Sequence, residues 1–255
     1  MKYGLLTIIA LLTVSIISCN KEAITPDNAN NNPYSLILQT LLDKDESDFT
    51  VLVSSSLGVS LLTANSLDNT STVVTAYERN FKDMGSLTVN NISIPFEATH
   101  YFLQSDSTLL ASDFIGKINE YDFSSKNTNE FPHFTKQYYS PNTTLLTFDG
   151  IVNNKLPRSN NLTINWTNDN DHVALKSIVI IYGADANDEN SKLIYKIPTS
   201  NSSSITFTNS ELSEFSKYER IRVYYARGYE NVDTINNKTI AFQFLNYSYA
   251  TIYLW

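Results

Sequence analysis

From Phe49 to the end of the chain, short segments with alternating apolar and polar side chains follow one another. Residues 162–166, for example, place Leu162, Ile164 and Trp166 on one side of an extended backbone. Residues 219–228 likewise place Ile221, Val223 and Tyr225 on one side and Arg222 and Tyr224 on the other. Alternation with a period of two is typical of β-strands that bury one face. Strand-forming aromatic residues are abundant, with 16 Tyr and 13 Phe but only 2 Met in 255 residues. Because β-branched and aromatic side chains favour a pleated surface, the sequence predicts an all-β fold.

A polar segment at residues 149–161 divides this strand pattern into two parts. It contains Gly, Pro and four Asn, which favour turns and interrupt strands. Before it, residues 34–150 predict a strand-rich N-terminal domain. After it, residues 151–255 hold short strands at nearly regular spacing, which predicts a β-sandwich. The expected architecture is therefore two β-sandwich-like domains.

Local patterns make more specific predictions. Asn90-Asn91 between two alternating arms predicts a hairpin turn, because Asn tolerates the left-handed backbone that such a turn needs. The last apolar run of the chain is predicted to bend into a hairpin at Asn246. Residues 209–215 predict a single helical turn capped by Ser210, with Leu212 and Phe215 facing inward. Residues 34–43 fit one face of a helix, although the run is short.

The first 18 residues have the form of a secretory signal peptide, with Lys2 followed by a short apolar core. This core is too short to span a bilayer comfortably, since a spanning helix needs about 20 apolar residues. It ends in Ile16-Ile17-Ser18-Cys19, which resembles the lipobox of bacterial lipoproteins. Cys19, the only cysteine, is therefore predicted to carry lipid after cleavage, and several acyl chains anchor a protein stably. The alternative is an ordinary secretory signal with a cysteine near its cleavage point.

Charge and the residues after Cys19 restrict location and partners. The net charge of −8 and the pI near 4.9 argue against nucleic acid and against electrostatic docking on anionic lipid. Residues 19–33 lack apolar periodicity and predict a flexible tether between the lipid and the fold. No Asp, the residue that retains many lipoproteins at the inner membrane, directly follows Cys19. The expected location is the outer membrane, on its surface or periplasmic face.

No complete catalytic motif is present in the sequence. The three histidines, His100, His133 and His172, have no partner at metal-ligand spacing, and there is no Gly-x-Ser-x-Gly nucleophile motif. Only seven glycines occur, so glycine-rich phosphate-binding loops are absent. Glu120 and Asp122 share a strand face and could pair as in a glycosidase, but such surface carboxylates are more often simply solvated. The chain is therefore predicted to be no enzyme and to need no cofactor.

Two acidic loops leave calcium binding open. Their candidate oxygen ligands are Asp169 and Asp171 in the first loop, and Asp185, Asn187, Asp188 and Glu189 in the second. Calcium prefers six to eight oxygen ligands, and loops of this kind can supply them. Asn and Asp also favour turns without any metal. Because turn chemistry accounts for both loops, no metal site is predicted.

Clustered aromatic residues are the remaining candidates for ligand contact. They lie in residues 131–139 and residues 224–229, beside polar groups. The candidates are Phe131, Phe134, Tyr138, Tyr139, Tyr224 and Tyr229. Flat rings stack on sugar faces and anchor protein interfaces. The alternative is that these rings fill the sandwich core or pack between the domains.

Three stretches in the C-terminal part resemble a known group of proteins. The sequences LTINW, SSITFTNSELSEF and RVYYARG are similar to the C-terminal domain of uncharacterised Bacteroidetes lipoproteins, which is immunoglobulin or fibronectin type III-like. The resemblance covers the signal and roughly residues 85–255. It implies a surface or periplasmic lipoprotein and supplies no catalytic residue.

The expected function is a non-enzymatic binding or structural role at the cell envelope, in adhesion or surface interaction. The membrane is the expected partner of the N-terminal lipid, and an unknown protein or glycan is the expected partner of the fold. The alternative function is that of a glycan-binding accessory lipoprotein in a polysaccharide uptake system.

Overall fold

The computed structural model describes residues 32–42, 47–59, 61, 71–105, 111–167, 175–183, 191–200 and 202–255. Most of these residues lie in strands. In chain order the elements are α1 (Pro33–Leu41), β1 (Phe49–Val59), β2 (Ser71–Glu78), β3 (Gly85–Val89), β4 (Ile92–Ile94), β5 (Phe96–Glu97), β6 (His100–Gln104), η1 (Ala111–Asp113), β7 (Lys117–Ser125), β8 (Phe134–Ser140), β9 (Leu146–Asp149), β10 (Lys155–Leu156), β11 (Leu162–Trp166), β12 (Lys176–Gly183), β13 (Lys192–Lys196), β14 (Ser204–Phe207), α2 (Asn209–Leu212), η2 (Ser213–Phe215), β15 (Arg220–Ile235) and β16 (Lys238–Leu254).

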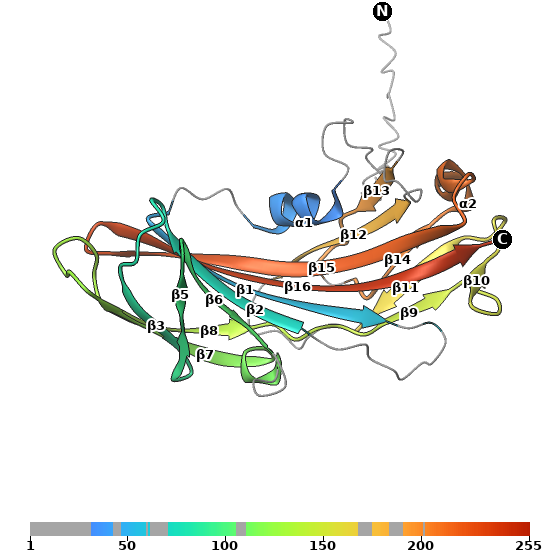
Figure 1. Ribbon diagram of the computed structural model, residues 1–255. Helices are drawn as coiled ribbons and strands as arrows, with labels where there is room; N and C mark the ends of the chain where they lie inside the picture. Colours follow the sequence, from blue (N-terminus) through green and yellow to red (C-terminus); the bar gives the residue numbers. More distant parts are fainter. Residues whose placement is uncertain are drawn as a thin grey trace, which may run out of the picture.

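One long sheet runs through the molecule (Figure 1). Its strands follow the order β13-β12-β15-β16-β1-β2-β6-β5, and β10 also pairs with β16. The central strands β15 and β16 have 16 and 17 residues and pair from Arg220 opposite Tyr253 to Ile235 opposite Lys238. β1 joins the other side of β16 in parallel, whereas the remaining neighbours along the path are antiparallel.

A tight turn at Asn236 and Asn237 joins β15 to β16. Their φ angles are 49° and 62°, as the two central residues of a type I′ hairpin require. The predicted turn between β3 and β4 has the same form, with φ angles of 51° and 64° at Asn90 and Asn91. The predicted bend at Asn246 is wrong, because β16 continues straight through this residue and buries its side chain.

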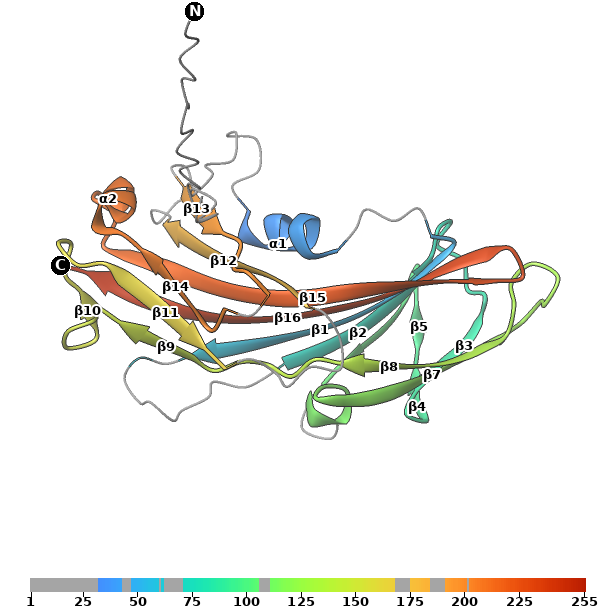
Figure 2. The same ribbon diagram turned by 180° about the vertical axis from the view of Figure 1, so that it is seen from behind.

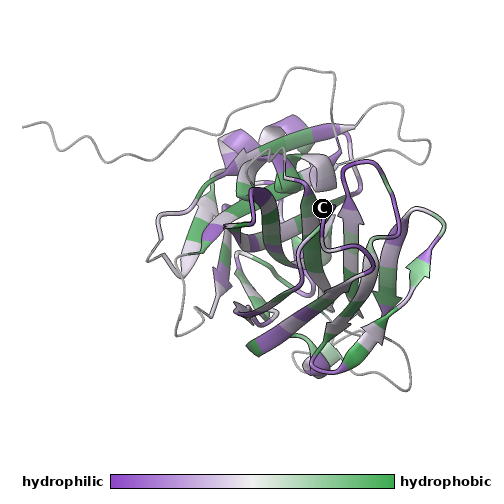
Figure 3. Ribbon diagram, turned by 90° about the vertical axis from the view of Figure 1, so that its left-hand side faces the viewer, coloured by the Kyte–Doolittle hydropathy of each residue, from purple (hydrophilic) through white to green (hydrophobic). Residues whose placement is uncertain are grey.

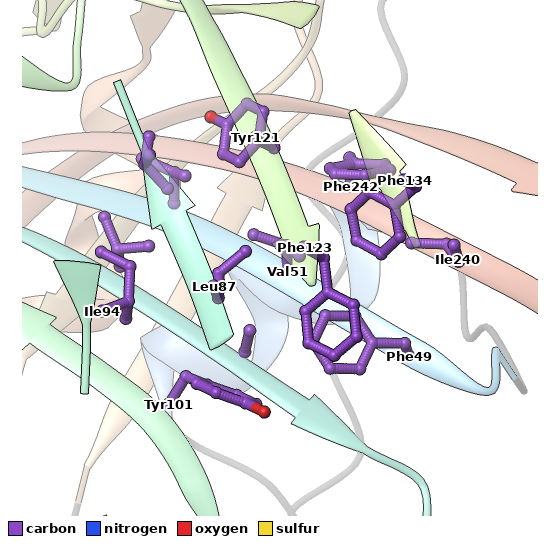
Figure 4. Close-up of a cluster of buried hydrophobic side chains, with 14 of the residues drawn as sticks. Phe49, Val51, Leu87, Ile94, Tyr101, Tyr121, Phe123, Phe134, Ile240 and Phe242 are labelled. Carbon is purple, nitrogen blue, oxygen red and sulfur yellow. The ribbon is translucent and has the colours of Figure 1, made fainter. Parts of the chain in front are cut away.

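Two smaller sheets cover the same face of the long sheet, one over each half (Figures 1 and 2). The sheet β4-β3-β7-β8 encloses an aromatic core, in which Phe49 lies 5.1 Å from Phe123 between ring centroids (Figure 4). The sheet β14-β11-β9 encloses a second core, in which Trp166 stacks on Tyr225 at 4.7 Å. Figure 3 shows hydrophobic and hydrophilic residues alternating along the strands. The predicted all-β, sandwich-like fold is confirmed.

The strands around the second core follow the order of an immunoglobulin-like sandwich. One sheet holds β9, β11 and β14, and the facing sheet holds β12, β13, β15 and β16. In chain order these seven strands take the positions A, B, C, C′, E, F and G of such a fold. The predicted inward faces of β11 and β15 are both buried in this core.

The two predicted domains share the long sheet. Strands β1 and β2, which precede residue 150, extend the sheet beyond β16. The turn-proximal ends of β15 and β16 in turn contribute Tyr229, Phe242 and Phe244 to the first core. The passage from one small sheet to the other lies between β8 and β9, so the predicted boundary at residues 149–161 falls inside the second half, while the long sheet continues unbroken past both.

Residues 141–145 cross the long sheet between the two cores without forming a strand. Side chains of the long sheet bond their carbonyl groups. Asn246 Nδ2 donates to the carbonyl of Pro141, and Ser248 Oγ donates to that of Thr144. We call this set of buried side chains the polar seam, which comprises Ser55, Arg227, Asn246 and Ser248. It satisfies backbone groups that would otherwise be buried without partners.

Helix α1 covers part of the opposite face of the long sheet (Figure 1). Asn32 caps it, since its Oδ1 accepts a hydrogen bond from the backbone N–H of Tyr34 at 2.9 Å. Pro33 follows at the first helical position, where a missing N–H costs nothing. Ile37 and Leu41 are buried against the sheet, so the helical interpretation of this segment is confirmed.

The predicted helical turn after β14 is present, but its cap is different. Thr208, and not Ser210, caps α2, and Glu211 completes a capping box by accepting from the Thr208 backbone N–H at 2.7 Å. Leu212 and Phe215 point into the second core as predicted.

Candidate functional site

Most of the aromatic residues predicted for ligand contact lie in the first core. Phe131, Phe134 and Tyr229 are only 2%, 5% and 6% exposed. Tyr138 is half-buried and packs on Phe242, with 4.7 Å between the ring centroids. These four rings are covered by the small sheet and by each other, so they do not offer a face to a ligand. Their surroundings match the alternative interpretation, in which these rings fill the core.

Tyr139 and Tyr224 lie apart from that core and from each other. Tyr139 is half-buried beside the polar seam, and its carbonyl accepts a hydrogen bond from the hydroxyl of Tyr229. Tyr224 is half-buried on the opposite face of the long sheet, the face that α1 covers in part. The six predicted residues therefore do not form one site: Tyr139 lies on the outward face of the first small sheet opposite the exposed Ile118, and Tyr224 lies on the opposite face of the long sheet.

Tyrosine side chains gather around Tyr224 on that face. Tyr249 is its cross-strand partner, and the two ring centroids are 6.2 Å apart. Tyr247 follows at 6.4 Å from Tyr249, and Tyr34 of α1 packs edge-on against Tyr247 at 6.1 Å. Tyr253 extends the same face toward the C-terminus and is 50% exposed. The spacing of Tyr247, Tyr249 and Tyr253 at alternate positions was the sequence signal for this shared face.

Two arginines lie among these rings. Arg222 NH1 donates a hydrogen bond to the hydroxyl of Tyr224 at 3.2 Å. This hydrogen bond raises the pKa of the Arg222 guanidinium, and the phenol oxygens of Tyr249 and Tyr182 add to the effect. Arg220, two residues earlier on the same face, is exposed opposite Tyr253. We call this surface the tyrosine–arginine patch, which comprises Tyr182, Arg220, Arg222, Tyr224, Tyr249 and Tyr253.

The arginines of the patch carry charge that the described part of the chain does not neutralise. Neither Arg220 nor Arg222 forms an ion pair with any described residue. Five lysines, by contrast, each lie within 4.0 Å of a carboxylate oxygen. They are Lys126, Lys136, Lys192, Lys196 and Lys238. In a chain of net charge −8, the patch is therefore a local concentration of available positive charge.

A smaller exposed ring pair lies toward the other end of the same sheet face. Tyr77 of β2 and Phe81 are 36% and 57% exposed, with 6.2 Å between their centroids. The backbone of Phe81 has a φ angle of 59°, which is unusual for a bulky residue. Glu78 supports this turn by accepting hydrogen bonds from the backbone and side chain of Asn80 at 2.7 and 2.8 Å. This ring pair carries no arginine hydrogen-bonded to a ring.

The paired carboxylates considered from the sequence lie on the exposed side of β7. Glu120 Oε2 accepts a hydrogen bond from Gln137 at 2.9 Å, and Asp122 Oδ1 accepts one from Thr135 at 2.7 Å. Each of these contacts joins directly opposite residues of β7 and β8. Cross-strand pairing therefore accounts for both acids.

The histidines and the other predicted sites are placed as follows. His100 packs edge-on against Phe102, and His133 Nδ1 accepts a hydrogen bond from the backbone N–H of Ser125 at 2.8 Å. Within the described residues, no group of three or more His, Cys, Asp or Glu side chains could hold a metal ion. The sites that lie outside the described residues are Cys19, the tether up to residue 31, His172 and both acidic loops, with Asp169, Asp171, Asp185, Asn187, Asp188 and Glu189.

No helix in the part of the chain that the structure describes has the length and apolar character needed to cross a membrane. No protein-family model matches the sequence, and no curated protein is significantly similar to it, so a functional assignment depends on the residues described above.

Proposed function

We propose that this chain is a lipid-anchored protein of the bacterial cell envelope that binds a surface partner through its tyrosine–arginine patch and catalyses no reaction. The lipobox at Ile16-Ile17-Ser18-Cys19 supports the anchor. The resemblance to Bacteroidetes lipoproteins supports an outer-membrane location, on its surface or periplasmic face. The lack of a nucleophile or zinc motif in the sequence supports binding over catalysis.

The patch is the observation that carries the binding role. Tyrosine and arginine are enriched among the residues that contribute most to binding energy at interfaces. Here they share one face of a rigid sheet, and Tyr224 holds the guanidinium of Arg222 in place. A side chain that is already oriented loses less conformational freedom on binding. The patch is therefore suited to contact a partner without rearrangement.

The rings of the patch also favour the second candidate, a glycan-binding accessory lipoprotein of a polysaccharide uptake system. Tyr224, Tyr249 and Tyr247 follow one another at centroid distances of 6.2 and 6.4 Å. The planes of successive rings differ by only 36° and 32°. Neighbouring rings at small tilts provide a surface on which flat sugar faces can stack.

Anchoring is tested by fractionating cells that express the wild type or Cys19→Ala. We expect the wild type in the membrane fraction and Cys19→Ala in the soluble envelope fraction, because acyl chains supply the membrane affinity. Unchanged processing and membrane association of Cys19→Ala would refute the anchor. Protease treatment of intact cells then determines the face, since only a surface-exposed protein is digested before the outer membrane is opened.

Binding is tested with fluorescently labelled full-length protein carrying Cys19→Ala, added to intact cells and to isolated envelopes of a strain that lacks the protein. We expect saturable binding that Arg222→Gln and Tyr249→Ala weaken. The matched controls are Arg79→Gln and Tyr77→Ala, which remove one exposed arginine and one exposed ring outside the patch. Equal binding of all variants would contradict a role of the patch. Turnover of any substrate in a broad panel of glycosides, esters and peptides would contradict the non-enzymatic role.

A further inference from the structure

Three features of the described residues could carry a more specific function. The ring pair of Tyr77 and Phe81 is exposed, but nothing beside it indicates the chemistry of a ligand. The polar seam is buried, and its side chains are occupied by carbonyl groups of the chain itself. The tyrosine–arginine patch combines rings with cationic groups that form no ion pair within the described residues, and this combination restricts the ligand.

The cations of the patch favour an anionic partner. Arg222 and Arg220 alternate with Ile221 along β15, so both guanidinium groups lie on the open face. A guanidinium presents a planar fork of N–H donors that matches the two oxygens of a carboxylate. Because the rest of the chain carries a net negative charge, an anionic ligand is attracted to this surface and repelled elsewhere.

The rings indicate that the anion is carried on a sugar. Every ring of the patch ends in a hydroxyl group, while Tyr182 and Tyr224 also pack against the aliphatic cluster that α1 covers. Its exposed part therefore combines aromatic faces with hydroxyl and guanidinium groups, a mixture that suits a sugar as well as a charge. A pyranose ring offers an apolar C–H face for stacking and hydroxyl groups for hydrogen bonds to phenols. A uronic acid adds a carboxylate at the edge of that ring, within reach of a guanidinium beside the stacked face.

The shape of the site indicates a polymer. The patch lies across three neighbouring strands, from Tyr182 on β12 through Tyr224 on β15 to Tyr249 on β16. Tyr247 and Tyr34 continue the run of rings toward α1. Several sugar residues of one chain can therefore contact the surface in succession. We propose that the tyrosine–arginine patch binds a polysaccharide that carries uronic acid carboxylates, an assignment that depends on the binding function proposed above.

The proposal is tested by bio-layer interferometry with immobilised polygalacturonate and alginate. The analyte is full-length protein carrying Cys19→Ala. We expect Arg222→Gln and Tyr249→Ala to weaken binding about tenfold or more, which corresponds to the loss of one charge-assisted or stacking contact of roughly 1.4 kcal/mol. Arg222→Lys keeps the charge but loses the fork, so it should weaken binding less than Arg222→Gln. Arg79→Gln and Tyr77→Ala should bind within about twofold of the parent protein. Binding should also weaken as salt rises.

Two further polymers separate the contribution of the carboxylate from that of the sugar ring. Carboxyl-reduced polygalacturonate keeps the sugar rings without the charge, and poly-glutamate keeps the charge without the rings. We expect at least tenfold weaker binding to each, again about 1.4 kcal/mol. Equal binding to the reduced polymer would refute the role of the carboxylate. Equal, patch-dependent binding to poly-glutamate would assign the patch to acidic peptides instead.

The failure of this inference can be distinguished from failure of the proposed function. If the acidic polysaccharides do not bind but Arg222→Gln still lowers binding to cells, the ligand class is wrong and the binding function stands. If Arg222→Gln and Tyr249→Ala change binding neither to cells nor to the acidic polysaccharides, both proposals fail. Because Arg222 is exposed, Arg222→Gln should unfold at the same urea concentration as the parent protein, and this check separates lost binding from lost folding.

Discussion

The hydroxyl of Tyr138 on β8 donates a hydrogen bond to Asp233 Oδ2 on β15, with 2.5 Å between the two oxygen atoms. Lys136 Nζ lies 2.9 Å from the same carboxylate oxygen. Partial burial opposes ionisation of Asp233, but these hydrogen bonds and the lysine charge outweigh it and lower the pKa of the carboxyl. Burial and the same contact raise the pKa of the Tyr138 phenol. The contact thus links the first small sheet to β15 by a hydrogen bond to a charged carboxylate.

Acid should destabilise the fold through this contact. The folded pKa of Asp233 lies below its unfolded pKa, so its contribution is complete above about pH 4 and is lost as pH falls through the folded pKa. The pKa values of Asp48, Asp83 and Glu211 are also lowered, because hydrogen bonds and a lysine outweigh partial burial. Urea unfolding should therefore show a falling free energy of unfolding as pH drops from about 4 to about 2.

The variant Asp233→Asn measures how much of this pH dependence comes from Asp233. It should be less stable than the wild type at neutral pH and should lose less stability on acidification. Glu130→Gln, at an exposed loop position, serves as the control and should follow the wild-type profile. Equal pH dependence of Asp233→Asn and the wild type would contradict the assignment.

Removing the side-chain amide of Asn246, at the centre of the polar seam, should lower the free energy of unfolding. In Asn246→Ala, the carbonyl of Pro141 and the hydroxyl of Ser55 lose their buried partner. Each buried polar group that is left without a partner costs about 1–3 kcal/mol. We therefore expect the free energy of unfolding, measured with urea, to fall by at least about 2 kcal/mol. Thr251→Ala, on the open face of the same strand, should change it by less than about 0.5 kcal/mol. Similar effects of the two substitutions would argue against the seam as a source of stability.

The turn at Asn236 and Asn237 should tolerate glycine but not alanine. Both residues have left-handed φ angles of 49° and 62°, a conformation that costs most residues with a Cβ about 1–2 kcal/mol each. Replacing both by Gly should therefore leave stability nearly unchanged, whereas replacing both by Ala should lower it by roughly 2–4 kcal/mol. Amide hydrogen exchange should be faster at the paired ends of β15 and β16 in the Ala variant only. Equal exchange in both variants would contradict this account.

Gly228 should not accept a side chain. It lies in the middle of β15, and a Cβ atom built on it would be 2.4 Å from the carbonyl oxygen of Phe244. The obstacle is backbone of the neighbouring strand, which cannot move without disturbing the pairing. Gly228→Ala should lower the free energy of unfolding by about 1–3 kcal/mol, as other overpacked sites do. A thermal unfolding midpoint equal to that of the wild type would show that the strands separate there without cost.

The sequence predicted local structure better than long-range arrangement. Alternation identified the buried sides of β11 and β15, and paired asparagines identified the turn at Asn90 and Asn91. The bend at Asn246 was predicted because asparagine usually marks turns, yet tertiary contacts make this residue a buried hydrogen-bonding group inside a strand. The parallel pairing of β1 with β16 joins residues about 190 positions apart and leaves no local pattern.

The candidate site was harder to predict for a related reason. Alternation shows that Tyr224 and Tyr225 face opposite sides of a strand, but it does not show which side a second sheet will cover. The small sheets cover the side of Tyr225, whereas within the described residues α1 covers only part of the side of Tyr224. The sequence left two interpretations of the segment 131–139 open, rings for ligand contact or rings that fill the core, because its rings adjoin polar residues. Its register against β7 instead turns Phe134 into the first core.

The parallel pairing of β1 and β16 also determines how these two strands would respond to a pulling force. β1 begins near the Asn236–Asn237 turn, with Phe49 opposite Ile240, whereas the patch lies toward the other end of β16. Between an anchor at the amino end and a ligand held at the patch, tension would first load α1, which packs on the long sheet with Tyr34 against Tyr247. Once α1 is detached, the force enters β1 at Phe49 and draws β1 and β16 in opposite directions along a common axis. All 11 residue pairs between them then share the force in shear, instead of opening one after another like a zipper.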